Sequence, residues 1–169
     1  MKKVIVVMGS DSDLQVMEGA IKVLRNFSVP FDVRIVSAHR TPSVAEELSK
    51  TAESQGAGVI IAAAGKAAHL AGVLAANTVL PVIGVPIRSS TMDGMDSLLS
   101  TVQMPTGVPV ATVAINGAEN AAILAVQILS MCEPRLVEAL KKHKHDMEKK
   151  VIEKDEYIRK QYSIMEVQI

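Results

Sequence analysis

The sequence predicts an α/β protein: a three-layer αβα sandwich on a parallel sheet, with a long C-terminal helix. Short apolar runs in it are continuous rather than alternating, which is typical of strands covered by helices on both faces. Segments with helical spacing of apolar residues follow these runs, so that the order β-α repeats five times. Such alternation indicates a parallel sheet with right-handed crossovers, of the flavodoxin-like kind.

The elements follow from these patterns in chain order. The expected strands are the apolar runs at 4–8, 31–36, 58–63, 82–87 and 109–115. The expected helices lie at 13–27, 43–55, 67–77, 95–103 and 118–131. Residues 1–133 are therefore expected to form one α/β domain.

A different pattern begins at Pro134. Seven apolar residues form a stripe close to a heptad repeat: Leu136, Leu140, Met147, Val151, Ile158, Tyr162 and Met165. A helix over 136–162 would be about 40 Å long, more than the body of a small domain can cover. We therefore expect 134–169 to be a helical extension of the same domain that packs on a neighbouring subunit of a homo-oligomer.

Composition narrows the class of ligand. The 169 residues carry 18 basic and 18 acidic side chains, so no broad positive field invites nucleic acid or a membrane surface. Only 2% of residues are aromatic, which excludes base stacking on an aromatic platform. The first apolar run is too short for a signal peptide or a membrane span, and we expect a cytoplasmic protein that binds a small molecule. The single cysteine, Cys132, ends an apolar helical pattern and is expected to be buried.

Polar loops follow the strands at the edge where open parallel sheets bind ligands. The first loop contains Ser10, Ser12 and Asp13 before a helix. These residues either cap the exposed N–H groups of that helix or, with its N-terminus, bind an anion such as phosphate.

The second loop reads Ser37-Ala38-His39-Arg40-Thr41-Pro42. Thr41 and Pro42 suit the cap and the first position of the next helix. His39 can move a proton near pH 7, and the Arg40 guanidinium suits phosphate. The alternative is a histidine and an arginine that lie on the surface by chance.

The third loop leads from small residues through Lys66 and Ala67 to His69 and Leu70. His69 either donates to a ligand carboxylate or bonds a backbone carbonyl, and Lys66 either faces a bound anion or faces solvent. The loop at 86–94 offers hydroxyls that can cover a ligand. No metal-binding constellation is visible, because His143 and His145 two residues apart on a helix point away from each other.

Four motifs in order resemble the PurE family, the N5-carboxyaminoimidazole ribonucleotide mutases. They are Met8-Gly9-Ser10-Asp11-Ser12-Asp13, Ser37-Ala38-His39-Arg40-Thr41-Pro42, Ala67-Ala68-His69-Leu70 and the run Asp96–Pro105. The resemblance implies an octameric flavodoxin-like enzyme of purine biosynthesis that moves a carboxylate from N5 to C4 of an aminoimidazole ribonucleotide. It also implies that Ser10, Asp13 and Arg40 bind substrate and that His39 handles the proton.

The chemistry implied by the resemblance needs no cofactor. An electron-rich aminoimidazole can release its N-carboxylate as CO2 and recapture it at carbon, without ATP, biotin or a metal. We therefore expect His39 and His69 to be catalytic, with His39 taking the C4 proton and His69 and nearby amides holding the carboxyl group. The expected substrate-binding residues are Ser10, Ser12, Asp13, Ser37, Ala38, Arg40, Lys66, Ala67 and Leu70.

The third loop departs from the family pattern. Ala63, Lys66 and Ala71 stand where the mutases usually have two glycines and a proline. Related animal-type carboxylases, which use free CO2 directly, have a basic residue near Lys66 but usually lack the Ala-Ala-His-Leu motif and have lysine after the first histidine. Arg40 and His69 favour the mutase. Direct carboxylation and a non-catalytic nucleotide-binding module are the alternatives.

Overall fold

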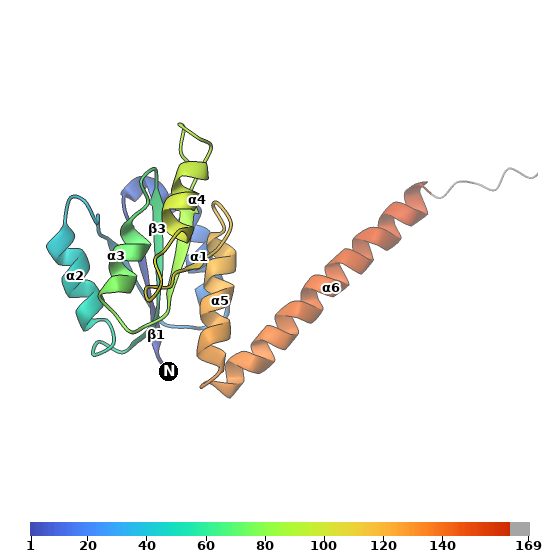
Figure 1. Cartoon of the computed structure of the whole chain (residues 1–169). Coiled ribbons are helices and arrows are strands. Elements are labelled where there is room, and N and C mark those ends of the chain that lie inside the picture. Colours follow the sequence, from blue (N-terminus) through green and yellow to red (C-terminus); the bar gives the residue numbers. More distant parts are fainter. Residues whose placement is uncertain (163–169) are drawn as a thin grey trace, which may run out of the picture.

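The computed structural model describes residues 1–162, which contain a five-stranded parallel sheet in the order β2-β1-β3-β4-β5 (Figure 1). The strands are β1 (Lys3–Met8), β2 (Phe31–Ile35), β3 (Ala57–Gly65), β4 (Val82–Ile87) and β5 (Ala111–Thr112). The helices are η1 (Asp11–Asp13), α1 (Leu14–Asn26), α2 (Pro42–Thr51), α3 (Leu70–Ala76), α4 (Met95–Val102), α5 (Ala118–Ser130) and α6 (Pro134–Tyr162). This order is that of the flavodoxin-like fold, which confirms the predicted fold class.

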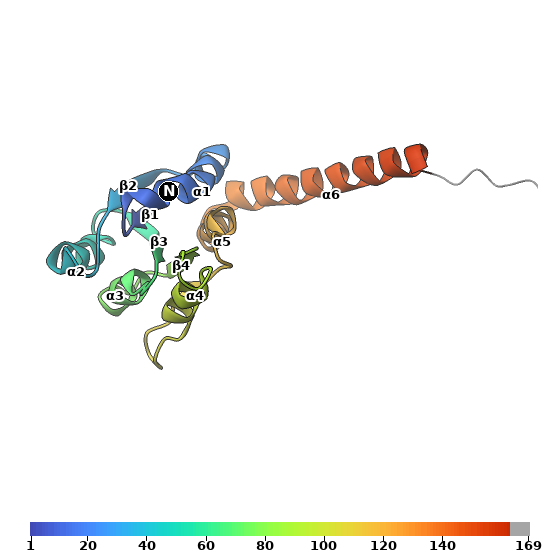
Figure 2. The same cartoon turned by 90° about the horizontal axis from the view of Figure 1, so that it is seen from above.

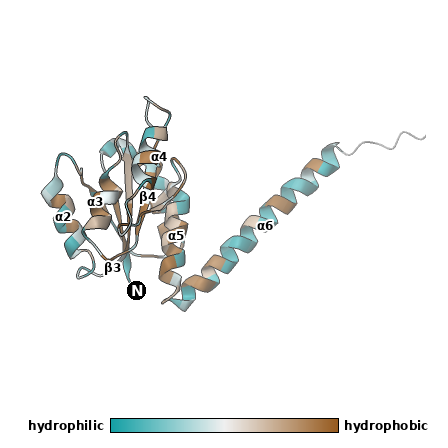
Figure 3. Ribbon diagram, in the orientation of Figure 1, coloured by the Kyte–Doolittle hydropathy of each residue, from teal (hydrophilic) through white to brown (hydrophobic). Residues whose placement is uncertain are grey.

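Helices cover both faces of the sheet. Figure 2 shows α1 and α5 on one face and α2, α3 and α4 on the other. Successive residues of β1 serve the two cores: Val4 and Val6 pack in the α1 and α5 layer, and Ile5 and Val7 pack in the α2 and α3 layer. Apolar residues gather in the strands at the centre of the domain and in the helices beside them (Figure 3). The continuous apolar runs therefore arise because both faces of each inner strand are buried.

One glycine sets how closely α4 approaches the sheet. A Cβ atom on Gly84 in β4 would lie 2.3 Å from Cγ2 of Thr101 in α4 and 3.4 Å from Cβ of Ala71 in α3. No real side chain tolerates the first distance. Gly84 therefore lets α3 and α4 pack directly against β4, the strand whose end reaches the site described below.

Two predictions about this region were wrong. The strand expected at 109–115 pairs only at Ala111–Thr112, because Pro109 has no N–H for the ladder and the chain turns at Asn116, which has a φ of 59°. Cys132 is exposed rather than buried, since it follows the last turn of α5 and the chain has already left the core.

The long C-terminal helix begins at Pro134 as predicted and runs to Tyr162. Its first turns are held to the domain by the fully buried Leu136 and by the Arg135 guanidinium, which donates to the carbonyls of Phe27 and Ser28 at 3.3 and 2.9 Å. Farther along, the helix leaves the body of the molecule (Figure 1).

The outer part of α6 carries the predicted apolar stripe without a cover. Met147, Val151, Ile158 and Tyr162 are 47, 67, 51 and 68% exposed. Met165, the last residue of the stripe, lies outside the described residues. Packing on a neighbouring subunit and the division at residue 133 stay predictions. Between residues 1 and 162, no helix combines the length and the apolar character needed to cross a membrane.

Candidate active site

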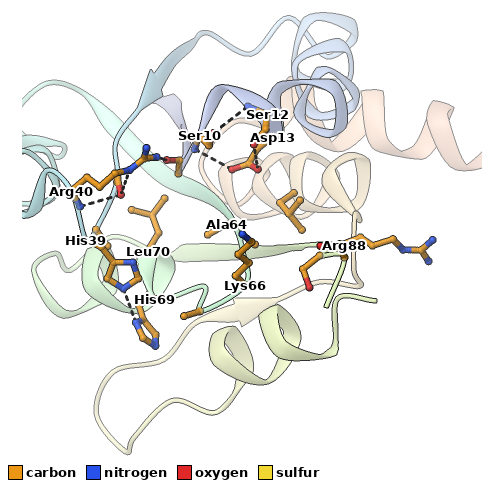
Figure 4. Close-up of a pocket in the computed structure, with 18 residues that line it drawn as sticks. Ser10, Ser12, Asp13, His39, Arg40, Ala64, Lys66, His69, Leu70 and Arg88 are labelled. Atoms are coloured by element: carbon orange, nitrogen blue, oxygen red, sulfur yellow. Dashed lines mark hydrogen bonds between the residues drawn. The ribbon is translucent and has the colours of Figure 1, made fainter. Parts of the chain in front are cut away.

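Three loops that follow β1, β2 and β3, together with the start of the loop after β4, line one cleft of about 670 Å³ (Figure 4). All eleven residues predicted to act at the site line it. They are Ser10, Ser12, Asp13, Ser37, Ala38, His39, Arg40, Lys66, Ala67, His69 and Leu70. The cleft lies at the carboxyl edge of the strands, which is the edge where the polar loops were expected to bind a ligand.

The first loop is a capped helix start. Oγ of Ser10 accepts from the backbone N–H of Ser12 at 3.3 Å, and the Asp13 carboxylate accepts from the backbone N–H of Ser10 at 3.2 Å. The capping interpretation of these residues is therefore confirmed, and they still face the cleft. Burial raises the pKa of the Asp13 carboxyl, and the hydrogen bonds from Ser10 and Ser12 offset only part of that rise.

The second loop is closed by Thr41. Its hydroxyl accepts from the backbone N–H of Ser37 and donates to the Ser37 carbonyl, both at 3.0 Å. Thr41 thus occupies the N-cap position of α2 without capping it through its side chain, contrary to the prediction, while Pro42 opens the helix as expected. Competition for one hydroxyl explains the difference, because closing the loop leaves no acceptor directed at the helix.

Arg40 joins the second loop to the first. Its Nη2 donates to the carbonyl of Gly9 at 3.1 Å, and its Nε donates to Oγ of Ser37 at 3.4 Å. Two of the five guanidinium donors are used in these bonds, which fix the group beside Ser10 (Figure 4). The remaining donors are available to an anion in the cleft.

The two histidines are hydrogen-bonded to each other. Nε2 of His39 lies 2.9 Å from Nδ1 of His69, and the rings meet at 84°. Such a contact requires a proton on one of the two nitrogens and a lone pair on the other. The predicted partners of His69 were a ligand carboxylate or a backbone carbonyl. The structure adds a third, another imidazole, which the sequence could not show because the residues lie 30 positions apart.

The third loop turns sharply at Lys66, which has a φ of 57°. The backbone N–H of Ala68 donates to the Lys66 carbonyl and that of His69 donates to the Ala67 carbonyl, so these two amides are already bonded. Lys66 lies at the centre of the view in Figure 4. Its ammonium group has no hydrogen bond or ion pair within residues 1–162.

Hydroxyls of the loop after β4 were expected to cover a ligand, although no single residue there was predicted to act at the site. Ser89 and Ser90 line the cleft, and the Ser89 hydroxyl donates to the Asp96 carboxylate at 2.8 Å. Arg88 points away from the cleft (Figure 4), and its Nε lies 3.2 Å from the Asp93 carboxylate. The strand-end rule that found the other loops could have named both serines.

Asn116 supports this loop from outside the cleft. Its side-chain oxygen accepts from the backbone N–H of Arg88 at 2.9 Å, and no pattern in the sequence indicated this contact.

Within residues 1–162, the cleft included, no group of three histidine, cysteine, aspartate or glutamate side chains is placed to hold a metal ion.

The comparisons with known proteins agree with this geometry. The family model described as AIR carboxylase matches residues 3–150. A Pyrococcus abyssi protein named N5-carboxyaminoimidazole ribonucleotide mutase is 58% identical over 149 residues, 88% of this chain and 86% of that protein. A Thermotoga maritima protein of the same name is 54% identical over 154 residues, 91% and 90% of the two chains.

A solved structure extends the agreement to the fold. The crystal structure of Treponema denticola PurE has a TM-score of 0.84 and 29% identity, and the match covers 92% of this chain and 98% of that one. The resemblance carried by the four sequence motifs is confirmed, and the chain belongs to the AIR carboxylase family.

Proposed function

We propose that this protein is an N5-carboxyaminoimidazole ribonucleotide mutase of purine biosynthesis, which moves a carboxylate from N5 to C4 of the aminoimidazole ring. The observation that carries the proposal is the His39–His69 pair, joined at 2.9 Å, in the same cleft as Arg40 and the capped loop at Ser10. A cleft of about 670 Å³ also suits a ligand of nucleotide size.

One side of the cleft suits the ribose phosphate. Arg40 presents its unused donors beside Ser10 and Ser37, and a guanidinium can bind phosphate with two parallel hydrogen bonds. Asp13 offers a carboxylate that can accept from a ribose hydroxyl. With the phosphoribosyl group fixed there, the aminoimidazole ring extends toward the histidine pair.

The reaction then needs one proton transfer and exclusion of water. The N5–C bond breaks, CO2 leaves, and the bonding electrons stay on N5, which takes up a proton. C4 attacks CO2 to form the C–C bond, and the proton on C4 goes to His39. The proton gained at N5 equals the one lost at C4, so no net proton is exchanged. A hydrogen-bonded imidazole pair suits this balance, because it can take up one proton and release another.

Confinement supplies the remaining requirement. CO2 recaptured at C4 must not diffuse into water, and a cleft that holds it beside the ring raises its effective concentration. Ala38, Ala67 and Leu70 give the wall small or apolar surface close to the histidines.

A second candidate is direct carboxylation of the uncarboxylated nucleotide by CO2, because the animal-type carboxylases also have a basic residue near the position of Lys66. The test is to supply each nucleotide separately, without ATP, to the purified full chain. We expect rapid conversion of the N5-carboxylated nucleotide at low bicarbonate. Turnover of the uncarboxylated nucleotide alone, dependent on CO2, would support the carboxylase, and no turnover of either would contradict both and support a binding module.

The proposal includes a homo-oligomer, with the octamer implied by the family resemblance as its expected size. Besides the stripe on α6, one face of α4 is bare: Met95, Leu99 and Val102 are each 46% exposed. Contiguous apolar faces of this kind are typical of subunit contacts. The cytoplasmic location stays a prediction from the sequence.

A further inference from the structure

We infer that Lys66 is a specificity-determining residue whose ammonium group binds the migrating carboxylate, so that the cleft prefers carboxylated nucleotides over the uncarboxylated one. This inference rests on the proposed function and deepens it. The mutase reaction itself needs a proton carrier and confinement, whereas the inference concerns which charge state of the nucleotide the cleft retains.

The backbone at Lys66 is the first observation. Four residues other than glycine have a positive φ within residues 1–162, namely Ser28, Lys66, Asp93 and Asn116. Asn and Asp tolerate this conformation, whereas a long side chain is disfavoured in it. Lys66 is the one of the four that lines the cleft. Glycine occupies positive-φ positions at Gly56, Gly94 and Gly107, so a lysine at 66 needs another explanation than the turn.

The second observation is that the hydrogen-bond donors and cations around Lys66 already have partners within the chain. The backbone N–H groups of Ala68 and His69 are used within the loop, and Nδ1 of His69 is used by His39. The Arg40 guanidinium is bound on the other side, to Gly9 and Ser37. Arg88 is paired with Asp93 and points away (Figure 4). Among the cations that line the cleft, Lys66 is therefore the one that no described contact engages.

The charges of the substrate complete the argument. The carboxylated nucleotide has two anionic groups, a phosphate and a carboxylate, and the uncarboxylated nucleotide has the phosphate alone. Arg40 matches the phosphate, which both nucleotides share. Lys66 matches the group that they do not share, so its charge discriminates between them.

A consequence for the intermediate follows. An ammonium group attracts a carboxylate on N5 or on C4 much more strongly than it attracts neutral CO2. Lys66 therefore stabilises both carboxylated nucleotides relative to the intermediate that contains free CO2. Negative charge develops on the CO2 oxygens as C4 attacks, so the ammonium group also favours recapture over escape, and fewer turnovers lose CO2 to water.

The experiment compares three variants of the full chain with the wild type. Lys66→Met removes the charge and keeps the disfavoured backbone, Lys66→Gly removes both, and Lys66→Arg keeps the charge. The measurements are the KM of the N5-carboxylated nucleotide, the inhibition constant of the uncarboxylated nucleotide, and the fraction of turnovers that release CO2.

Losing a charge-assisted hydrogen bond predicts a KM about ten- to hundredfold higher for Lys66→Met and Lys66→Gly. The inhibition constant of the uncarboxylated nucleotide should change by less than about threefold, and Lys66→Arg should stay close to the wild type. CO2 release should rise in the two uncharged variants. The melting temperature of Lys66→Gly should be above that of Lys66→Met, because glycine relieves the backbone.

Three results overturn the inference. If Lys66→Met matches the wild type in KM, or if it weakens both nucleotides equally, Lys66 does not discriminate, and the mutase function survives. If the wild type itself converts neither nucleotide, the proposed function is wrong, and this inference, which rests on it, is wrong as well.

Discussion

Polar groups of the cleft have hydrogen-bond partners within the described chain, whereas the apolar side chains on the outer part of α6 have no cover there. In the cleft, polar groups of one copy bond to one another: Arg40 to the Gly9 carbonyl, Thr41 to Ser37, and His39 to His69. On α6, Val151 and Ile158 expose apolar surface that nothing in the described chain covers. The hydrogen bonds that shape the cleft are therefore made within one copy, whereas the apolar surface of α6 has no cover in residues 1–162, which is the basis of the proposed subunit contact.

The largest expected effect comes from the cleft. His39→Asn keeps a side chain that can hydrogen-bond to His69 but cannot take up a proton. We expect kcat to fall by about 10²- to 10⁴-fold while nucleotide affinity changes little, measured by steady-state kinetics and by calorimetric titration. The matched control is His145→Asn, whose side chain on α6 is 74% exposed and should not affect turnover. Near-normal turnover of His39→Asn would remove the proposed role.

An intermediate effect is expected on α6. Val151→Lys with Ile158→Lys places two charges in the stripe, where each buried aliphatic side chain would contribute about 1.5–3 kcal/mol to a subunit contact. Sedimentation should show a smaller assembly than the wild type. Lys149→Gln with Glu153→Gln, an exposed ion pair on the same helix, should leave the assembly unchanged.

The same variant tests whether the cleft is complete within one copy. If the cleft is complete within one copy, the dissociated variant should bind the nucleotide with unchanged affinity. Loss of binding together with the assembly would show that a neighbour contributes to the cleft. A wild type that sediments as a monomer would contradict the role assigned to the stripe.

The smallest effect concerns Asp13. Because burial raises its pKa above the ordinary 3.8, the folded chain holds this proton more tightly than the unfolded chain, and ionisation of the carboxyl costs stability as pH rises. Asp13→Asn removes that cost. The unfolding free energy of Asp13→Asn should therefore rise relative to that of the wild type as pH increases above about 3.8, measured by denaturant titration.

Glu46→Gln on α2 is the control for the direction. Its pKa is lowered by the hydrogen bond from Lys50, so the ionised carboxylate favours the folded state above that pKa. The unfolding free energy of Glu46→Gln should therefore fall relative to that of the wild type as pH rises, which is the opposite of the change expected for Asp13→Asn. Parallel stability curves for Asp13→Asn and the wild type would contradict the burial argument.

Much of the fold could be predicted because its signals are local. The continuous run at Val4–Met8 reports two buried faces, and Pro134 marks where the last helix begins. The strand-end rule placed the cleft. The short pairing of β5 and the exposure of Cys132 could not be predicted in the same way, because each depends on where the chain leaves the sheet.

Local sequence patterns specify the αβα order, the edge of the sheet that carries the polar loops, and the residue types in those loops, since hydrophobic periodicity and capping act over a few neighbouring positions. Tertiary structure alone decided that His39 meets His69 and that Arg40 reaches Gly9. Those contacts depend on the strand order β2-β1-β3, which brings three loops from distant parts of the chain to one edge. Distances between loops are set by how strands pair, and strand pairing is a property of the whole sheet.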